Sequence, residues 1–173
     1  MPISLHDAFV PTVRQTLGAV NGLIGKAERW CAETGTAEAA IVGATLHDTM
    51  LPFSFQIRSV AHHSLGAIEG VRAGLFDATG GEMPGTLAAM KDLLGRADAG
   101  LAAVEPEEME GFMGKDVAFD LRGMKIPFVA ENFLLSFSQP NFFFHAATAY
   151  DLLRSKGVPL GKRDFLGQLR VKI

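Results

Sequence analysis

The chain has 173 residues and a net charge of −3, with 48% hydrophobic and 20% charged residues, as is typical of one globular domain spanning residues 1–173. It contains no block of basic residues and no apolar run long enough to cross a bilayer, and its first residues lack the basic and apolar regions of a signal peptide. We therefore expect a cytoplasmic protein without a signal peptide that binds neither nucleic acid nor membranes. The single cysteine, Cys31, excludes an internal disulfide and a zinc site built from several cysteines of one chain.

Helical periodicity begins near the N-terminus. Apolar residues recur three and four positions apart over residues 5–30, which predicts a long amphipathic helix. Ser4, with Asp7 three residues later, is suited to cap its start, and Gly35 is suited to end it. Residues 38–46 are compatible with a short helix of their own.

A second long helix is predicted over residues 53–72, where the apolar positions again follow the helical period. Pro52 fits its first turn, because the N–H that proline lacks has no partner at that position. Asp48 or Thr49 is the predicted cap.

The middle of the chain combines a helix with a hairpin. Residues 86–104 carry a third helical stripe. In residues 116–128 apolar and polar residues alternate on either side of Arg122-Gly123, which predicts a small β-hairpin with a tight turn.

The last helix is predicted from Val129 to about Lys156, with Gly157 at its end. Pro140 interrupts the pattern, so we expect a kink or a restart there with Ser138 as a cap. Four principal helices and one hairpin predict an all-α fold, a four-helix bundle with a small β-hairpin inserted before the last helix. Because this helix is apolar on most of its faces, we also expect a homodimer.

Polar residues on the last helix are the first candidates for a site. Asn141 and His145 lie four residues apart and therefore share a face with Thr148 and Leu152. Such a pair can chelate a metal, but asparagine is a poor ligand for zinc-like ions. Residue types alone favour the alternative, a core histidine that is hydrogen-bonded to a neighbour.

The other histidines are weaker candidates. His47 lies beside Asp48 before the second helix, where a cap or surface position is the simpler interpretation. His62 and His63 are adjacent, so their side chains diverge by about 100° and at most one faces the core. For both we expect surface or partly buried positions rather than ligation.

The C-terminal motif carries a family resemblance. The segment "HAATAYDLLRSKGVPLG" resembles the end of the last helix in the DinB-like superfamily, in which an inward histidine precedes a Leu-Arg-x-x-Gly exit. With "LHDTMLPFSFQIRSVAHHS", "PNFFFHAATAYDLLRSKGVPLGKRDFLG" and the long first helix, most of the chain is similar to a bacterial branch of that superfamily, a domain of unknown function. The resemblance implies the same helical-bundle architecture.

The resemblance also implies where a metal would lie. Classical members of the superfamily bind a divalent metal through one histidine on the second helix and two, four residues apart, on the last. Matching the Leu-Arg-x-x-Gly motif places His145 at the second of that pair and Asn141 at the first. The second-helix position falls near Gln56 or on His47. The implied site is degenerate, with His145 as its retained ligand and, at most, weakly bound Zn or Ni.

We expect Gln56, Asn141 and His145 to converge, with His47 at the rim, and to bond one another, water, a weakly bound metal or a small ligand. Two functions remain open. One is a small-ligand-binding or interaction scaffold without the full three-histidine site. The alternative is a metal-dependent transferase or hydrolase, similar to the thiol transferases of the superfamily, with an altered metal site.

Overall fold

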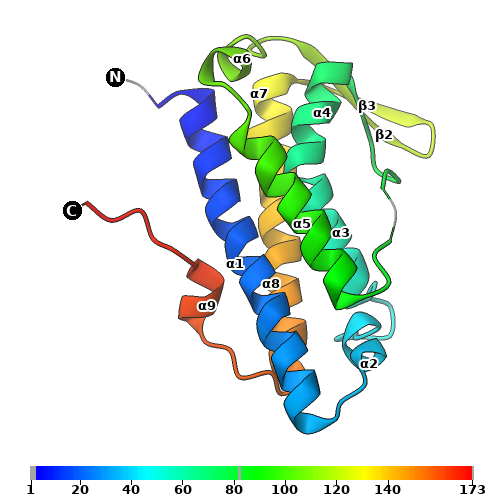
Figure 1. The fold of residues 1–173 in the computed structure, drawn as a ribbon. Helices are drawn as coiled ribbons and strands as arrows, with labels where there is room; N and C mark the ends of the chain where they lie inside the picture. Colours follow the sequence, from blue (N-terminus) through cyan, green and yellow to red (C-terminus); the bar gives the residue numbers. More distant parts are fainter. Residues whose placement is uncertain (1–2, 82, 173) are drawn as a thin grey trace.

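In the computed structural model, residues 3–81 and 83–172 are described, and they form a mostly helical protein with a small sheet at one end (Figure 1). Helix α1 packs against both α5 and α8, and α3 packs against the same two helices, so the core lies inside a closed ring of helices. Helix α3 continues, after a break, into α4. The long elements are α1 (Leu5–Thr34), α3 (Phe53–His62), α4 (Leu65–Ala73), α5 (Leu87–Ala102) and α8 (Gln139–Ser155).

Shorter elements connect these helices. They include a π-helical segment, η1, directly before α8, and a short helix in the C-terminal segment that the sequence did not predict. These elements are α2 (Glu38–Val42), β1 (Leu75–Asp77), α6 (Pro106–Glu110), β2 (Asp116–Leu121), β3 (Met124–Val129), α7 (Ala130–Asn132), η1 (Phe133–Ser138) and α9 (Lys162–Leu166).

Large aromatic side chains fill the core. They come from α1, α3, β1, η1 and α8, and each is 0–2% exposed. Burying a phenylalanine in this way contributes about 1.5–3 kcal/mol relative to leaving it in water. The residues are Phe9, Phe53, Phe76, Phe133 and Phe142.

Three predicted helix termini are confirmed. The Ser4 hydroxyl accepts a hydrogen bond from the Asp7 N–H at 3.0 Å, and Gly35 ends α1 with φ of 69°. Gly157 follows α8 with φ of 94°. A left-handed residue at this place turns the chain out of the helix, and glycine adopts it without a steric penalty.

The predicted start of the second helix is wrong in detail. Asp48 and Thr49 make no cap, because Pro52 itself occupies the cap position and α3 begins at Phe53 without a side-chain cap. Pro52 holds φ at −70° and ψ at 171°, an extended conformation that leads into the helix.

The second helix is also not continuous, as the sequence predicted it to be. It ends at His62 and restarts at Leu65, and Ser64 between them has φ of −103° and ψ of −96°. The Ser64 hydroxyl donates to the Ala61 carbonyl at 2.8 Å, which competes with the regular backbone bonds of the helix.

The hairpin is confirmed, but the sheet has three strands rather than two. Strands β2 and β3 are antiparallel around Arg122 and Gly123, whose φ values are 53° and 90°. Strand β1 joins them in parallel with β2, with Phe76 paired to Phe119. A strand of three residues is too short to show an alternating pattern in the sequence, so it escaped prediction.

The expected restart at Pro140 is wrong as well. Ser138 has helical φ and ψ of −70° and −45°, and its side chain makes no cap. The backbone therefore runs from η1 into α8 without interruption. A proline ring inside a helix meets the carbonyl four residues earlier. The π-helical turn of residues 133–138 widens the helix where that carbonyl lies.

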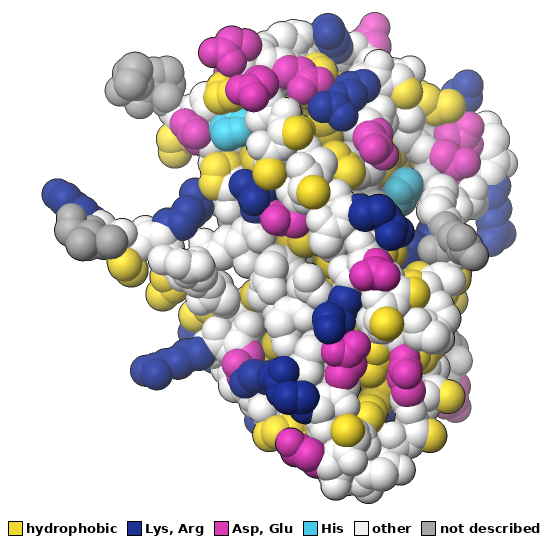
Figure 2. Space-filling view, viewed as in Figure 1, with side chains coloured by type: hydrophobic (Ala, Val, Ile, Leu, Met, Phe, Trp, Pro, Cys, Tyr) yellow, Lys and Arg dark blue, Asp and Glu magenta, His cyan; other side chains and the backbone are white. Residues whose placement is uncertain are grey.

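The surface mixes charges of both signs. Figure 2 shows Lys and Arg interspersed with Asp and Glu over the face that carries α1 and α5. Among the described residues, no helix is both long and apolar enough to cross a membrane.

Two glycines give a test of the packing between α4 and the sheet. A Cβ at Gly70 would lie 3.0 Å from Phe76 Cβ and 3.3 Å from its Cα, whereas one at Gly95 would meet nothing within 4 Å. We expect Gly70→Ala to lower the free energy of unfolding by about 1–3 kcal/mol through overpacking. Gly95→Ala should raise it by roughly 0.5–1 kcal/mol. Urea denaturation measures both, and equal effects would contradict the close approach of β1 to α4.

Candidate functional site

Gln56 and His145 meet between α3 and α8. Gln56 is 3% exposed, and its Oε1 lies 2.7 Å from Nδ1 of His145. Its Nε2 donates to the Leu51 carbonyl at 2.9 Å. Because a carbonyl only accepts, this second bond orients the amide and makes Oε1 the acceptor for Nδ1–H of His145. The neutral imidazole is therefore left with an acceptor lone pair on Nε2.

A second histidine, His63, is oriented in a similar way. Its Nδ1 lies 3.1 Å from Oγ of Ser138, and the Ser138 hydroxyl donates to the backbone carbonyl of His63 at 3.1 Å. Since the hydroxyl hydrogen is used there, the serine oxygen accepts from Nδ1–H of His63. His63 thus also presents an unprotonated Nε2.

Aromatic rings surround the two imidazoles. The rings of His63 and His145 are stacked, with centroids 5.9 Å apart and planes inclined by 14°. Further rings lie with centroids 5.2–5.9 Å from one or the other imidazole. We call this group the imidazole cluster: His63, His145, Phe55, Phe76, Phe137 and Phe144.

Both imidazoles are held neutral. Burial lowers the pKa of His145 to about 4. Burial, with the nearby charges of His145, His62 and Arg58, lowers the pKa of His63 to about 3. Desolvation disfavours the charged form, so at neutral pH neither ring is a cation and Nε2 of each carries a lone pair that is able to accept a hydrogen bond.

The other two sequence candidates find partners elsewhere. Asn141 Nδ2 donates to the Phe137 carbonyl of its own helix at 2.7 Å. His47 is exposed in the loop between α2 and α3, where its Nδ1 lies 2.9 Å from Oγ1 of Thr49. The structure therefore brings Gln56 and His145 together, while the bonds of Asn141 and His47 are local.

Sequence reasoning gave too little weight to His63, which is 8% exposed. Its position does continue the buried spacing of Gln56 and Val60, by four and then three residues. That spacing was the available signal, but the adjacent His62 obscured it. The contact with Ser138 depends on the break after His63, which periodicity does not reveal.

The comparisons with known proteins agree with this architecture. The sequence matches a family described as Domain of unknown function (DUF1993) over residues 5–166. The chain belongs to the DUF1993 family. A crystal structure of a DinB family member from Shewanella denitrificans at 1.83 Å resolution is similar with a TM-score of 0.81 and 19% identity, covering 98% of this chain and 95% of that one. No curated protein matches the chain.

These findings confirm the resemblance predicted from the C-terminal motif. The DUF1993 match establishes the family, and the likeness to the DinB family member establishes the fold. At 19% identity, the likeness carries no residue roles to this chain.

The side chains at the three implied ligand positions do not fit a three-ligand metal centre as they are arranged. Gln56 uses both ends of its amide in hydrogen bonds, and Asn141 turns its amide nitrogen onto its own helix. Nε2 of His145 is the only imidazole nitrogen at these three positions that is able to ligate a metal, and divalent zinc-like ions prefer imidazole, thiolate or carboxylate ligands. Within residues 3–81 and 83–172, no group of three or more His, Cys, Asp or Glu is placed to hold a metal ion.

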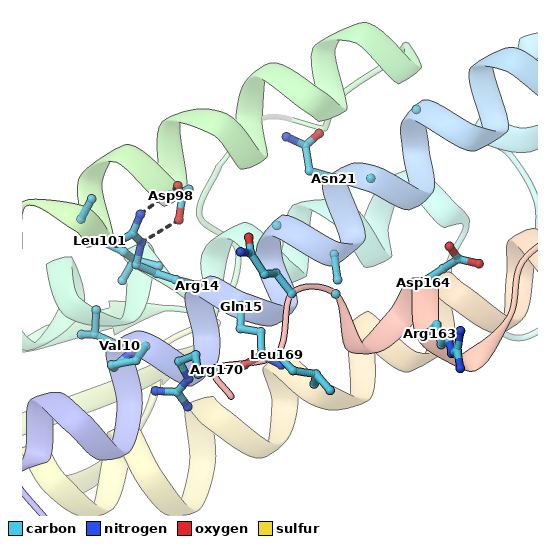
Figure 3. Close-up of a pocket in the computed structure, with 18 of the residues that line it drawn as sticks. Val10, Arg14, Gln15, Asn21, Asp98, Leu101, Arg163, Asp164, Leu169 and Arg170 are labelled. Atoms are coloured by element: carbon cyan, nitrogen blue, oxygen red, sulfur yellow. Dashed lines mark hydrogen bonds and ion pairs between the residues drawn. The ribbon is translucent and has the colours of Figure 1, made fainter. Parts of the chain in front are cut away.

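A separate groove lies between α1, α5 and the C-terminal segment (Figure 3). Two ion pairs lie within it. Arg14 Nε lies 2.8 Å from Oδ1 of Asp98, and Lys26 Nζ lies 2.6 Å from Oδ1 of Asp164. The first pair links α1 to α5, and the second links α1 to α9. The second pair therefore holds α9 of the C-terminal segment against α1.

The neutral histidines predict a pH-dependent stability. The unfolded chain takes up protons on them below pH about 6.5, whereas the folded chain resists until about pH 4 for His145 and about pH 3 for His63. The stabilisation that comes from keeping these two histidines neutral is therefore fully present above pH about 6.5. As the pH falls from there toward the folded pKa values, the free energy of unfolding decreases by at most about 1.4 kcal/mol per pH unit for each histidine.

His63→Asn keeps an N–H near the Nδ1 position but does not ionise. We expect it to reduce the fall in unfolding free energy between pH 7 and pH 5, as measured by urea denaturation. His47→Asn removes an exposed histidine and is the matched control. An undiminished fall in His63→Asn would show that His63 is not held neutral by its surroundings.

Proposed function

We propose that this DUF1993 protein is a binding protein, a small-ligand-binding or interaction scaffold that works without the three-histidine metal centre of the DinB-like superfamily. The bond between His145 and Gln56 carries the proposal. It occupies Nδ1 of a neutral imidazole and leaves Nε2 to accept a hydrogen bond. A hydroxyl or amine of a ligand is the complementary donor.

The surroundings of His145 support a ligand with an apolar or aromatic body. Phe55 and Phe144 contact its ring edge-on, with centroids at 5.9 and 5.2 Å. Phe144 is 60% exposed, so one wall of the imidazole cluster faces the surface. In this proposal α1, α3–α4, α5 and α8 are the four helices of the predicted bundle, and the cytoplasm is its proposed location.

One observation favours the alternative, a metal-dependent transferase or hydrolase with an altered site. Metal-binding histidines commonly donate the N–H of their other ring nitrogen to a protein acceptor. His63 and His145 both do so. In that alternative, their Nε2 atoms are the ligands for a weakly bound Zn or Ni.

Replacing His145 separates the two functions. His145→Ala leaves Oε1 of buried Gln56 without its partner, so we expect unfolding free energy to fall by about 1–3 kcal/mol. Metal content of the untagged protein should not change. Asn141→His rebuilds the pair of histidines four residues apart and should raise the affinity for Zn or Ni in a metal titration. Stoichiometric metal in the wild type, lost in His145→Ala, would instead establish the alternative.

A homodimer is part of the proposal, because the exposed Phe144 ring lies on α8. Exposed apolar surface marks a contact surface when it is contiguous, and the apolar character of α8 on most of its faces is the reason to test Phe144. At a protein concentration of tens of micromolar, a dimer with a dissociation constant of roughly one micromolar is largely formed. We expect sedimentation at this concentration to give a dimer for the wild type and a monomer for Phe144→Ser. Leu169→Ser, at a residue that is 53% exposed, is the control and should stay dimeric. A monomeric wild type would refute the assembly.

A further inference from the structure

A second cavity of about 370 Å³ lies between α3–α4 and α5, and Gly80 and Gly81 of the loop after β1 form part of its wall. We call it the Arg58 cavity. Leu65 and Leu93 line it with apolar surface, while Arg58 and Arg96 contribute cations. Neither Gln56 nor His145 lines it, so a ligand bound in this cavity would be independent of the proposed function.

Arg58 is the unusual group in this cavity. It is 8% exposed, and its Nη2 donates to the carbonyls of Ala78 and Gly80, which fixes the guanidinium in place. Its Nε is fully buried and has no hydrogen-bond partner among the described residues. A buried N–H of a charged group is normally paired, so this position lacks an acceptor.

Arg58 and Arg96 also lack carboxylate partners in the described part of the chain, whereas Arg14 and Arg72 each bind a carboxylate through two nitrogens. Asp77 acts on Arg58 through its charge, but its Oδ1 accepts from the N–H and hydroxyl of Thr79.

The remaining polar side chains of the cavity, His62 and Glu69, form no ion pair with Arg58 or Arg96. His62 donates Nε2–H to the Asp77 carbonyl at 2.7 Å and stacks on Phe76, so its ring forms a fixed wall. Glu69 is exposed at the cavity and forms no ion pair among the described residues. Its charge disfavours a polyanion and leaves room for an anion with one charged group.

We propose that the Arg58 cavity binds a small organic oxyanion. Its carboxylate or phosphate accepts from the guanidinium groups of Arg58 and Arg96, and its apolar body lies against Leu65 and Leu93. Guanidinium groups match the geometry of both oxyanions, and the two apolar side chains select against inorganic ions alone.

The test is a titration of ¹⁵N-labelled protein, followed through the Nε–H signal of Arg58 and the amide signals of Gly80 and Gly81. The probes are sodium hexanoate and hexyl phosphate, with sodium chloride at equal ionic strength and hexan-1-ol as controls. We expect saturable shifts with at least one oxyanion. Saturable shifts with hexanoate alone would indicate a carboxylate ligand, and shifts with hexyl phosphate alone would indicate a phosphate monoester. Shifts with both would indicate that the cavity recognises the oxyanion chemistry that the two share.

Arg96→Gln alters an exposed position on α5, and we expect it to weaken binding at least about tenfold, since a charge-assisted bond is lost. Arg29→Gln, an exposed arginine on α1, should bind as the wild type does. The proposal is overturned if neither oxyanion gives shifts beyond those of chloride at about 10 mM, which marks binding weaker than millimolar. It is also overturned if hexan-1-ol binds equally well, or if Arg96→Gln retains full affinity.

Discussion

The contact between Ser138 and His63 joins the two irregular positions of the helical frame. Ser138 lies at the end of the π-helical segment, and His63 lies where α3 breaks. One hydroxyl satisfies both the backbone carbonyl of His63 and its Nδ1–H. The same π-helical segment carries Phe137, which contacts Phe119 and Phe128 of the sheet. The break in α3 and the orientation of His63 are therefore tied to the π-helical segment through one buried contact, and the sheet packs on the same segment through Phe137.

Much of the helical frame was readable in the sequence because it rests on periodic burial. The stripe of α1 and its Ser4 cap, and the turn at Arg122, are local features, and each was predicted. The break at Ser64 and strand β1 were not, because both depend on partners distant in sequence. The presence of Pro140 showed that the helix must be perturbed there, but not that a wider π-helical turn would accommodate the proline ring.

In the candidate site, too, some contacts were predictable from the sequence and others were not. The pairing of Gln56 with His145 follows from helix register and from the family resemblance, both of which the sequence contains. Asn141 satisfied the same register, yet its short amide reaches its own helix more easily than it reaches across to α3. His63 and the unpaired Nε of Arg58 depend on the loop and the helix break that surround them. Spacing alone therefore located the helix faces, and three-dimensional contacts decided which side chains meet.

The parallel pairing of β1 with β2 has a consequence for the order of folding. The hairpin of β2 and β3 is local, whereas β1 precedes α5 in the chain and must wait for the whole connection through α5 and α6 to return. Closing so long a connection costs chain entropy that three paired residues do not offset. Docking of α5 on α1 must therefore supply the compensating free energy, and completion of the sheet becomes a late, cooperative event rather than a nucleus.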